Sequence, residues 1–174
     1  MRLKLQFSFL LISAFTFTVC AQKTQSGWKV LNESAYSIQY PSNWTLDQTG
    51  AQGVTFVINS EPTGFNDFKE SVNLIIHDLR GTTINLDKLV KQSESTFPAT
   101  VVNFKLIEST RLKDSGEYHK IVFTGDKGKL KLKFVQYLRV KGIKAYVTTF
   151  TAEQSQFDSY KETGEKILSS FKVK

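Results

Sequence analysis

The sequence predicts an α+β protein in which a central antiparallel β-sheet is flanked by helices. Two observations favour this class. Runs of β-branched and aromatic residues recur along the chain and are joined by short polar turns, as in antiparallel meanders. Two other segments, one in the middle of the chain and one at its end, carry apolar residues at helical spacing. The length of 174 residues suits a single domain behind a signal peptide.

The amino-terminal segment has the layout of a secretory signal peptide. Arg2 and Lys4 precede an apolar run from Phe7 to Val19, which is shorter than the roughly 20 residues that a spanning helix needs. The signal indicates an exported protein, either periplasmic or secreted. The chain is therefore divided into a signal peptide, a flexible lead-in and one domain, at residues 1–21, 22–27 and 28–174.

The site of signal cleavage separates a released protein from an anchored one. Val19 and Ala21 fit the small-residue pattern that would release a mature chain starting at Gln22. In the alternative, a bacterial lipoprotein, Cys20 becomes the lipid-bearing first residue, although Val19 departs from the Gly, Ala or Ser that usually precedes such a cysteine. Either way no thiol remains for a disulfide or a nucleophile, and the core alone must hold the domain together.

The composition is basic. The chain has 23 Lys and Arg against 16 Asp and Glu, a net charge of +7, and loss of the two basic residues in the signal lowers this to +5. This charge favours an acidic partner, either a protein or an anionic component of the cell envelope, and allows association with a membrane surface. It does not indicate a nucleic-acid-binding protein, and no motif indicates a cofactor.

The first part of the mature chain is predicted to be mostly strands. Residues between Asn32 and Ala35 form the turn of a small hairpin. The strands are expected at Trp28–Leu31, Tyr36–Tyr40, Val54–Asn59 and Ser71–Leu79. The loop between the last two, SEPTGFNDFKE, contains Phe65 and Phe68 and is the least constrained segment.

A helix follows these strands. Asn85 is a good N-cap, and Pro98 is expected to end the helix. Its apolar residues follow helical spacing, at Leu86, Leu89, Val90 and Phe97.

An antiparallel meander and a second helix complete the domain. The meander strands are expected at Phe104–Leu112, Tyr118–Thr124, Leu130–Val140 and Ala145–Thr151. The last helix begins near Phe157 and presents one apolar face to the sheet. Thr151 with Gln154, or Ser155 alone, is predicted to cap it.

The stretch YPSNW is predicted to be a structural corner. Pro41 lacks an amide donor and holds Tyr40 in extended geometry, so the strand ends there and the chain turns. Trp44 returns three residues later, where its ring can close the end of the core. An exposed Trp44 that stacks on a sugar or a base is the alternative.

The order of segments after this corner resembles the PsbP-like and DcrB-like superfamily. The segments are VTFVINSE, ESVNLIIHDL, a helix after NLDKLV, KFVQYLRVKGIKAYVTTFTAE and FDSYKETGEKILSSFK, which ends in an SF motif. The resemblance covers Trp28 to Lys174. It implies an α/β/α sandwich and a role in binding or assembly without bond-making chemistry. Members of the superfamily have unrelated partners, so the resemblance implies no particular partner.

The strand expected at Leu130–Val140 provides the candidate binding surface. Its alternating pattern places one apolar row on one face and a largely basic row on the other. The candidate partner-binding residues of this row are Lys131, Lys133, Tyr137, Arg139 and Lys141. An ordinary solvated face is the competing interpretation. Phe65 and Phe68 form a second candidate, either as exposed anchors or packed back onto the sheet.

No catalytic set can be recognised in the sequence. His77 and His119 have no spacing that would place two ligands on one metal, and no nucleophile elbow is present. We therefore predict an exported, non-enzymatic binding or accessory protein. A lipid-anchored form with a basic membrane-facing or glycan-facing surface is the alternative, and a small hydrolase built around one histidine and a carboxylate is the third hypothesis.

Overall fold

The computed structural model describes residues 26–62, 68–113 and 116–174. The predicted signal peptide, with its candidate processing residues Cys20 and Ala21, lies outside the described residues, and so does Phe65. The strands are β1 (Trp28–Asn32), β2 (Tyr36–Pro41), β3 (Thr45–Asp47), β4 (Phe56–Asn59), β5 (Ser71–Asp78), β6 (Val102–Leu112), β7 (Tyr118–Lys127), β8 (Leu130–Lys141), β9 (Lys144–Glu153) and β10 (Lys172–Val173). The helices are η1 (Ala51–Gly53, a 3-10 helix), α1 (Leu86–Thr100) and α2 (Phe157–Ser170).

The strands form a seven-stranded and a three-stranded sheet, and every neighbouring pair is antiparallel. The larger sheet has the order β3-β4-β5-β9-β8-β7-β6, and the smaller one has the order β1-β2-β10. Strands β6 to β9 are consecutive hairpins, as their turn signals predict. The predicted α+β class is confirmed.

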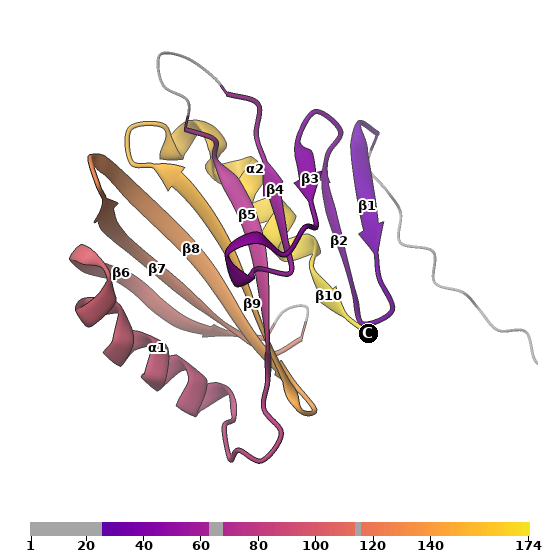
Figure 1. The fold of residues 1–174 in the computed structure, drawn as a ribbon, viewed down its shortest axis with the longest axis vertical. Coiled ribbons are helices and arrows are strands. Elements are labelled where there is room, and N and C mark those ends of the chain that lie inside the picture. Colours follow the sequence, from indigo (N-terminus) through magenta and orange to yellow (C-terminus); the bar gives the residue numbers. More distant parts are fainter. Residues whose placement is uncertain (1–25, 63–67, 114–115) are drawn as a thin grey trace, which may run out of the picture.

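The two helices lie on opposite faces of the larger sheet (Figure 1). Helix α1 packs against β6, β7 and β8, whereas α2 packs against β9, β5, β8 and strand β2 of the smaller sheet. Each helix covers its own apolar cluster, and the cluster beneath α2 also joins the two sheets. The result is the predicted sandwich of a sheet between helices.

The YPSNW stretch turns the chain out of the smaller sheet. Strand β2 ends at Pro41, whose carbonyl accepts a hydrogen bond from the Trp44 amide at 3.0 Å. The Trp44 side chain is only 5 % exposed and meets the Tyr160 ring edge-on, with centroids 6.3 Å apart. Tyr40 is also buried. A buried ring suits the structural corner and leaves no free face for stacking on a sugar or a base.

Both helices differ from the prediction at one end. Helix α1 begins after Asn85, whose side chain accepts from the Lys88 amide at 2.9 Å, but it continues two residues past Pro98. It continues because the Val101 amide still donates to the Phe97 carbonyl at 2.8 Å.

The predicted caps of α2 are wrong. Strand β9 extends to Glu153 and therefore contains Thr151. The N-cap is Gln156, which makes no capping hydrogen bond through its side chain. A backbone turn from the Gln156 amide to the Glu153 carbonyl, at 3.0 Å, connects the strand to the helix instead.

Candidate binding surface at the β6 edge

The basic row predicted on β8 lies on the sheet face that α2 covers. Lys131 and Lys141 at its ends are exposed and Lys133 is half-buried. Tyr137 and Arg139, in the middle, are only 5 % and 8 % exposed because α2 packs over them. The expectation of one continuous solvent-facing row is therefore wrong. Lys131 and Lys141, at the two ends of the row, lie about 30 Å apart along the strand and do not form a single patch.

Arg139 is part of the packing between the sheet and the end of α2. Its guanidinium lies 4.5 Å from the ring centre of Tyr118 and 5.5 Å from those of Tyr137 and Phe171. Such cation–π contacts are strongest when they are shielded from water. Arg139 is therefore packed in the interior and is not exposed to a partner. At the far end of the strand, the Lys141 ammonium donates to the carbonyl of Val173 at 3.4 Å.

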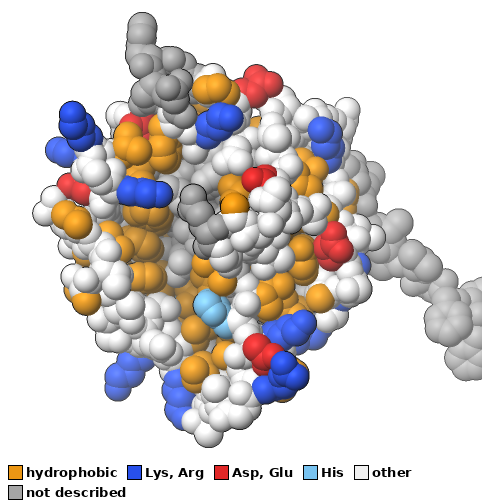
Figure 2. Space-filling view, viewed as in Figure 1, with side chains coloured by type: hydrophobic (Ala, Val, Ile, Leu, Met, Phe, Trp, Pro, Cys, Tyr) orange, Lys and Arg blue, Asp and Glu red, His pale blue; other side chains and the backbone are white. Residues whose placement is uncertain are grey.

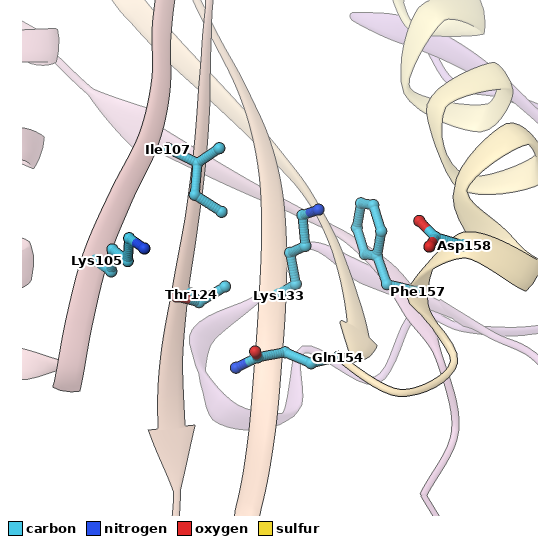
Figure 3. A pocket seen from close by; sticks show the side chains of 7 residues that line it. All are labelled: Lys105, Ile107, Thr124, Lys133, Gln154, Phe157 and Asp158. Atoms are coloured by element: carbon cyan, nitrogen blue, oxygen red, sulfur yellow. The ribbon is translucent and has the colours of Figure 1, made fainter.

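The other end of the row opens into a cleft between β6 and the start of α2, which we call the β6 cleft. It has a volume of about 320 Å³. Its lining residues are Lys105, Ile107, Thr124, Lys133, Gln154, Phe157 and Asp158 (Figure 3). The Lys133 ammonium lies 4.0 Å from the centre of the Phe157 ring, which fixes this charge at the cleft wall.

Irregular pairing of β6 with β7 shapes this cleft. Leu106 pairs with Phe123 and Glu108 with Val122, so Ile107 is an extra residue in the ladder. A β-bulge of this kind redirects a side chain. Ile107 lines the cleft with Lys105 yet remains 51 % exposed.

Strand β6 is also an edge strand of the larger sheet. Leu106 and Val102 on it are 42 % and 65 % exposed. Exposed apolar side chains on an edge strand beside lysines are a common setting for contact with another molecule.

Phe68, the member of the second predicted candidate that the structure describes, lies away from this cleft. Phe68 is half-buried and lines a different hollow, on the opposite face of the sheet. It packs back toward the sheet, which is the second of the two alternatives left open for it.

A polar cluster that the sequence did not reveal, centred on the buried His119, ties α1 to β6 and β7. The Ser109 hydroxyl lies 2.7 Å from Nε2 of His119 and also donates to the Glu94 carboxylate. A hydroxyl has one proton and a carboxylate can only accept, so His119 Nε2–H must donate to Ser109. This polarity is opposite to that of a serine nucleophile activated by histidine, in which the ring accepts the hydroxyl proton.

This assignment leaves His119 Nδ1 buried without a hydrogen-bond partner among the described residues. Burial and the nearby Arg111 guanidinium hold the pKa of His119 below its ordinary value of 6.5, while Glu94 and Asp87 act in the opposite direction. The folded protein therefore favours the neutral ring, since protonation would bury a second N–H without an acceptor.

Stability is expected to fall as the pH is lowered below about 6.5. The folded-state pKa lies below the unfolded one, so the unfolded chain binds more protons in this window and gains free energy relative to the native state. Urea denaturation at pH 7.5, 6.5 and 5.5 measures the slope. His119→Gln, which can still donate to Ser109, should flatten it, whereas His77→Gln, at an exposed position, should not. An unchanged slope in His119→Gln would contradict this assignment.

No cluster of three or more metal-ligating side chains occurs within residues 26–62, 68–113 and 116–174. In the same ranges, no helix has both the length and the apolar character needed to cross a membrane.

The arrangement of sheets and helices was compared with known proteins. No protein-family model and no curated protein matches the sequence. Solved structures do match. The cyanobacterial PsbP (CyanoP) of Synechocystis sp. PCC 6803 aligns with a TM-score of 0.64 and 16 % identity, over 89 % of this chain and 97 % of that one. The chain has the PsbP-like fold.

Two further solved structures, from other organisms, have a similar fold. LpqN of Mycobacterium tuberculosis, involved in cell envelope biogenesis, aligns with a TM-score of 0.63 and 11 % identity, over 84 % of this chain and 90 % of that one. The Ran-binding protein Mog1p of Saccharomyces cerevisiae aligns with a TM-score of 0.55 and 9 % identity, over 87 % and 96 %. The predicted resemblance is confirmed as a likeness of fold.

Within this PsbP-like fold, the structure joins some predicted residues to others that the sequence did not single out. Lys133 of β8 lines the same cleft as Lys105 of β6 and Phe157 of α2. Lys105 lies near Lys133 because Lys105 pairs with Thr124 and Thr124 pairs with Lys133, and the bulges in β6 hide this register from the sequence.

Proposed function

We propose that this protein is an exported, non-enzymatic binding or accessory protein of the cell envelope, and that it binds an acidic partner protein through the β6 cleft. The observation that carries the proposal is the combination of Lys105 and Lys133 with the exposed Ile107 at a bulged sheet edge. An apolar centre ringed by cations suits a protein surface with carboxylates around an apolar residue.

The charge of the cleft supports an acidic partner. Two lysines and one aspartate line it, and Lys131 stands exposed beside it on β8. The excess positive charge would speed encounter with an acidic surface and would make binding sensitive to salt.

The compared proteins support the binding role by analogy. Among proteins of this fold, one is a Ran-binding protein and another is involved in cell envelope biogenesis. The predicted export signal is consistent with a role at the cell envelope, in whose biogenesis the second of these proteins is involved. Neither likeness specifies the partner, because one fold supports many functions.

Charge reversal at the cleft tests the proposal. The variant Lys105→Glu/Lys131→Glu/Lys133→Glu is expected to lose most of the partner protein that cross-links to and co-purifies with the wild type from native envelopes. Raised salt should weaken the wild-type complex in the same way. The matched control reverses three exposed lysines elsewhere, Lys29, Lys91 and Lys144, and should retain the partner.

Equal recovery of partner by both reversal variants would contradict the cleft assignment, provided that thermal midpoints match the wild type. Binding to vesicles of anionic phospholipid, lost in the cleft variant, would favour the membrane-facing alternative instead. The intact mass of the mature protein distinguishes release after Ala21 from acylation at Cys20.

A further inference from the structure

A second hollow lies on the opposite face of the sheet, beside the η1 segment. Its volume is about 450 Å³, in the range of pockets for small ligands, about 300–1,000 Å³. Helix α1 packs on β6, β7 and β8 and leaves the β4–β5 side of this face uncovered. Figure 2 views the molecule from this side and shows hydrophobic side chains exposed over this face, with basic and acidic side chains scattered among them.

The strand register builds the floor of this hollow as two rows. Residues that pair directly across antiparallel strands point to the same face and lie side by side. One row crosses β4, β5, β9 and β8 as Asn59, Ser71, Thr151 and Phe134. The next row is Val57, Asn73, Thr149 and Gln136.

The face of the sheet that carries these rows is largely polar, whereas the opposite face of the same strands is apolar. Val72 and Leu74, the neighbours of Asn73 along β5, are fully buried in the core beneath α2. Gln136 and Thr149 satisfy each other through a 3.0 Å hydrogen bond. The amide and hydroxyl groups of Asn73, Ser71 and Thr151 line the hollow.

The side-chain amide oxygen of Asn73 is buried and lacks a hydrogen-bond donor among the described residues. Buried polar atoms nearly always have a partner, which can be a protein group, an ordered water or a bound molecule. Asn73 lines the hollow, so a rotation of its amide would let an N–H or O–H from a molecule bound there supply that partner.

An aromatic wall stands at the end of the polar row. Phe134 stacks on Phe123 with ring centres 4.7 Å apart and planes 15° apart. One ring face is thus occupied by Phe123, so the opposite side is left to line the hollow. Phe123 stacks in turn on Phe97 of α1, which holds the wall in place.

We propose that this hollow, the Asn73 site, binds an uncharged saccharide of one or two rings. Sugar hydroxyls both donate and accept, so they can satisfy Asn73, Ser71 and Thr151 together, while the C–H face of a sugar ring packs on an aromatic ring. Among the described residues that line the hollow, only Asp47 and Lys127 are charged. Their opposite charges cancel, so the hollow has no net charge that would attract an ion. The inference concerns a different face of the molecule from the β6 cleft and does not depend on it.

Titration of the isotope-labelled mature protein with glucose, N-acetylglucosamine, cellobiose and chitobiose, followed by NMR, tests the site. At least one sugar is expected to give saturable shifts centred on the amides of Ser71, Asn73, Phe134 and Thr151. Asn73→Leu should weaken that binding by about tenfold or more, the effect of losing one buried hydrogen bond. The same variant should keep or raise the thermal midpoint, because it removes an unpaired buried acceptor from the native state.

A second variant separates binding from folding. Thr151→Val removes only a hydroxyl from the hollow and is expected to weaken the same sugar, whereas Thr110→Val, at an exposed position of β6, should not. Three results would overturn the proposal: no shifts with any of the four sugars, shifts that map elsewhere, or unchanged sugar affinity in Asn73→Leu and Thr151→Val. A lower thermal midpoint of Asn73→Leu with unchanged affinity would assign Asn73 a structural role.

Discussion

Replacing Trp44 with Ala is expected to lower the free energy of unfolding by about 3–5 kcal/mol. The indole ring is 5 % exposed, belongs to the core cluster beneath α2 and contacts Tyr160 of that helix. Removing it leaves a cavity between the corner after β2 and α2. Urea denaturation monitored by circular dichroism measures the loss.

Trp28→Ala is the matched control for this variant. Trp28 is half-buried at the start of β1, with the Lys166 ammonium 5.0 Å from its ring centre. The same ring is removed there with less burial lost, so the destabilisation should be clearly smaller. Equal losses in the two variants, or a wild-type midpoint for Trp44→Ala, would contradict the structural corner.

Replacing Gly164 with Ala is expected to destabilise the protein, although Ala is the better helix former by about 1 kcal/mol. Gly164 lies in α2 where the helix rests on the ring of Phe150 in β9. A methyl group at this position would stand 2.6 Å from three atoms of that ring, and Phe150 itself is fully buried. Overpacking of a tight core costs about 1–3 kcal/mol, which outweighs the gain in helix propensity.

A second substitution locates the cause of this loss. Phe150→Leu shortens the side chain beneath the helix, so Gly164→Ala should cost less in the Phe150→Leu background than in the wild type. Such a coupling between the two positions is measured by a double-mutant cycle. Lys161→Ala, at an exposed position of the same helix, should change stability by less than about 0.5 kcal/mol. Stabilisation by Gly164→Ala would show that α2 does not approach β9 this closely.

The local elements that carried strong sequence signals agree with the structure. The hairpin of β1 and β2, the N-cap at Asn85 and the strands of the meander depend on neighbours in the chain, so turn chemistry and periodicity were sufficient. The short strands β3 and β10 were missed because two or three residues carry no periodic signal. Strand β10 exists because Phe171 is anchored against Tyr36 and Tyr146, which positions the chain end beside β2.

The candidate sites could be predicted only in part. Alternation along β8 correctly grouped Lys131, Lys133, Tyr137 and Arg139 on one face, but it could not reveal that α2 covers the middle of that face. Local pattern gives the side of a strand on which a residue lies, and tertiary packing decides whether that side meets water. Arg139 therefore became part of the core while Lys133 remained at a cleft.

By itself the sequence determined the fold class, the order of the longer strands and of α1 and α2, the corner at Pro41 and the basic charge of the chain, because each of these follows from local propensity and composition. Only the tertiary structure decided the bulge that turns Ile107 into the β6 cleft, the Ser109–His119–Glu94 cluster and the polar rows in which Asn73 lies. These features depend on strand register and on which helix covers which face. Both are set by contacts between residues far apart in the chain, which one sequence does not encode in any local pattern.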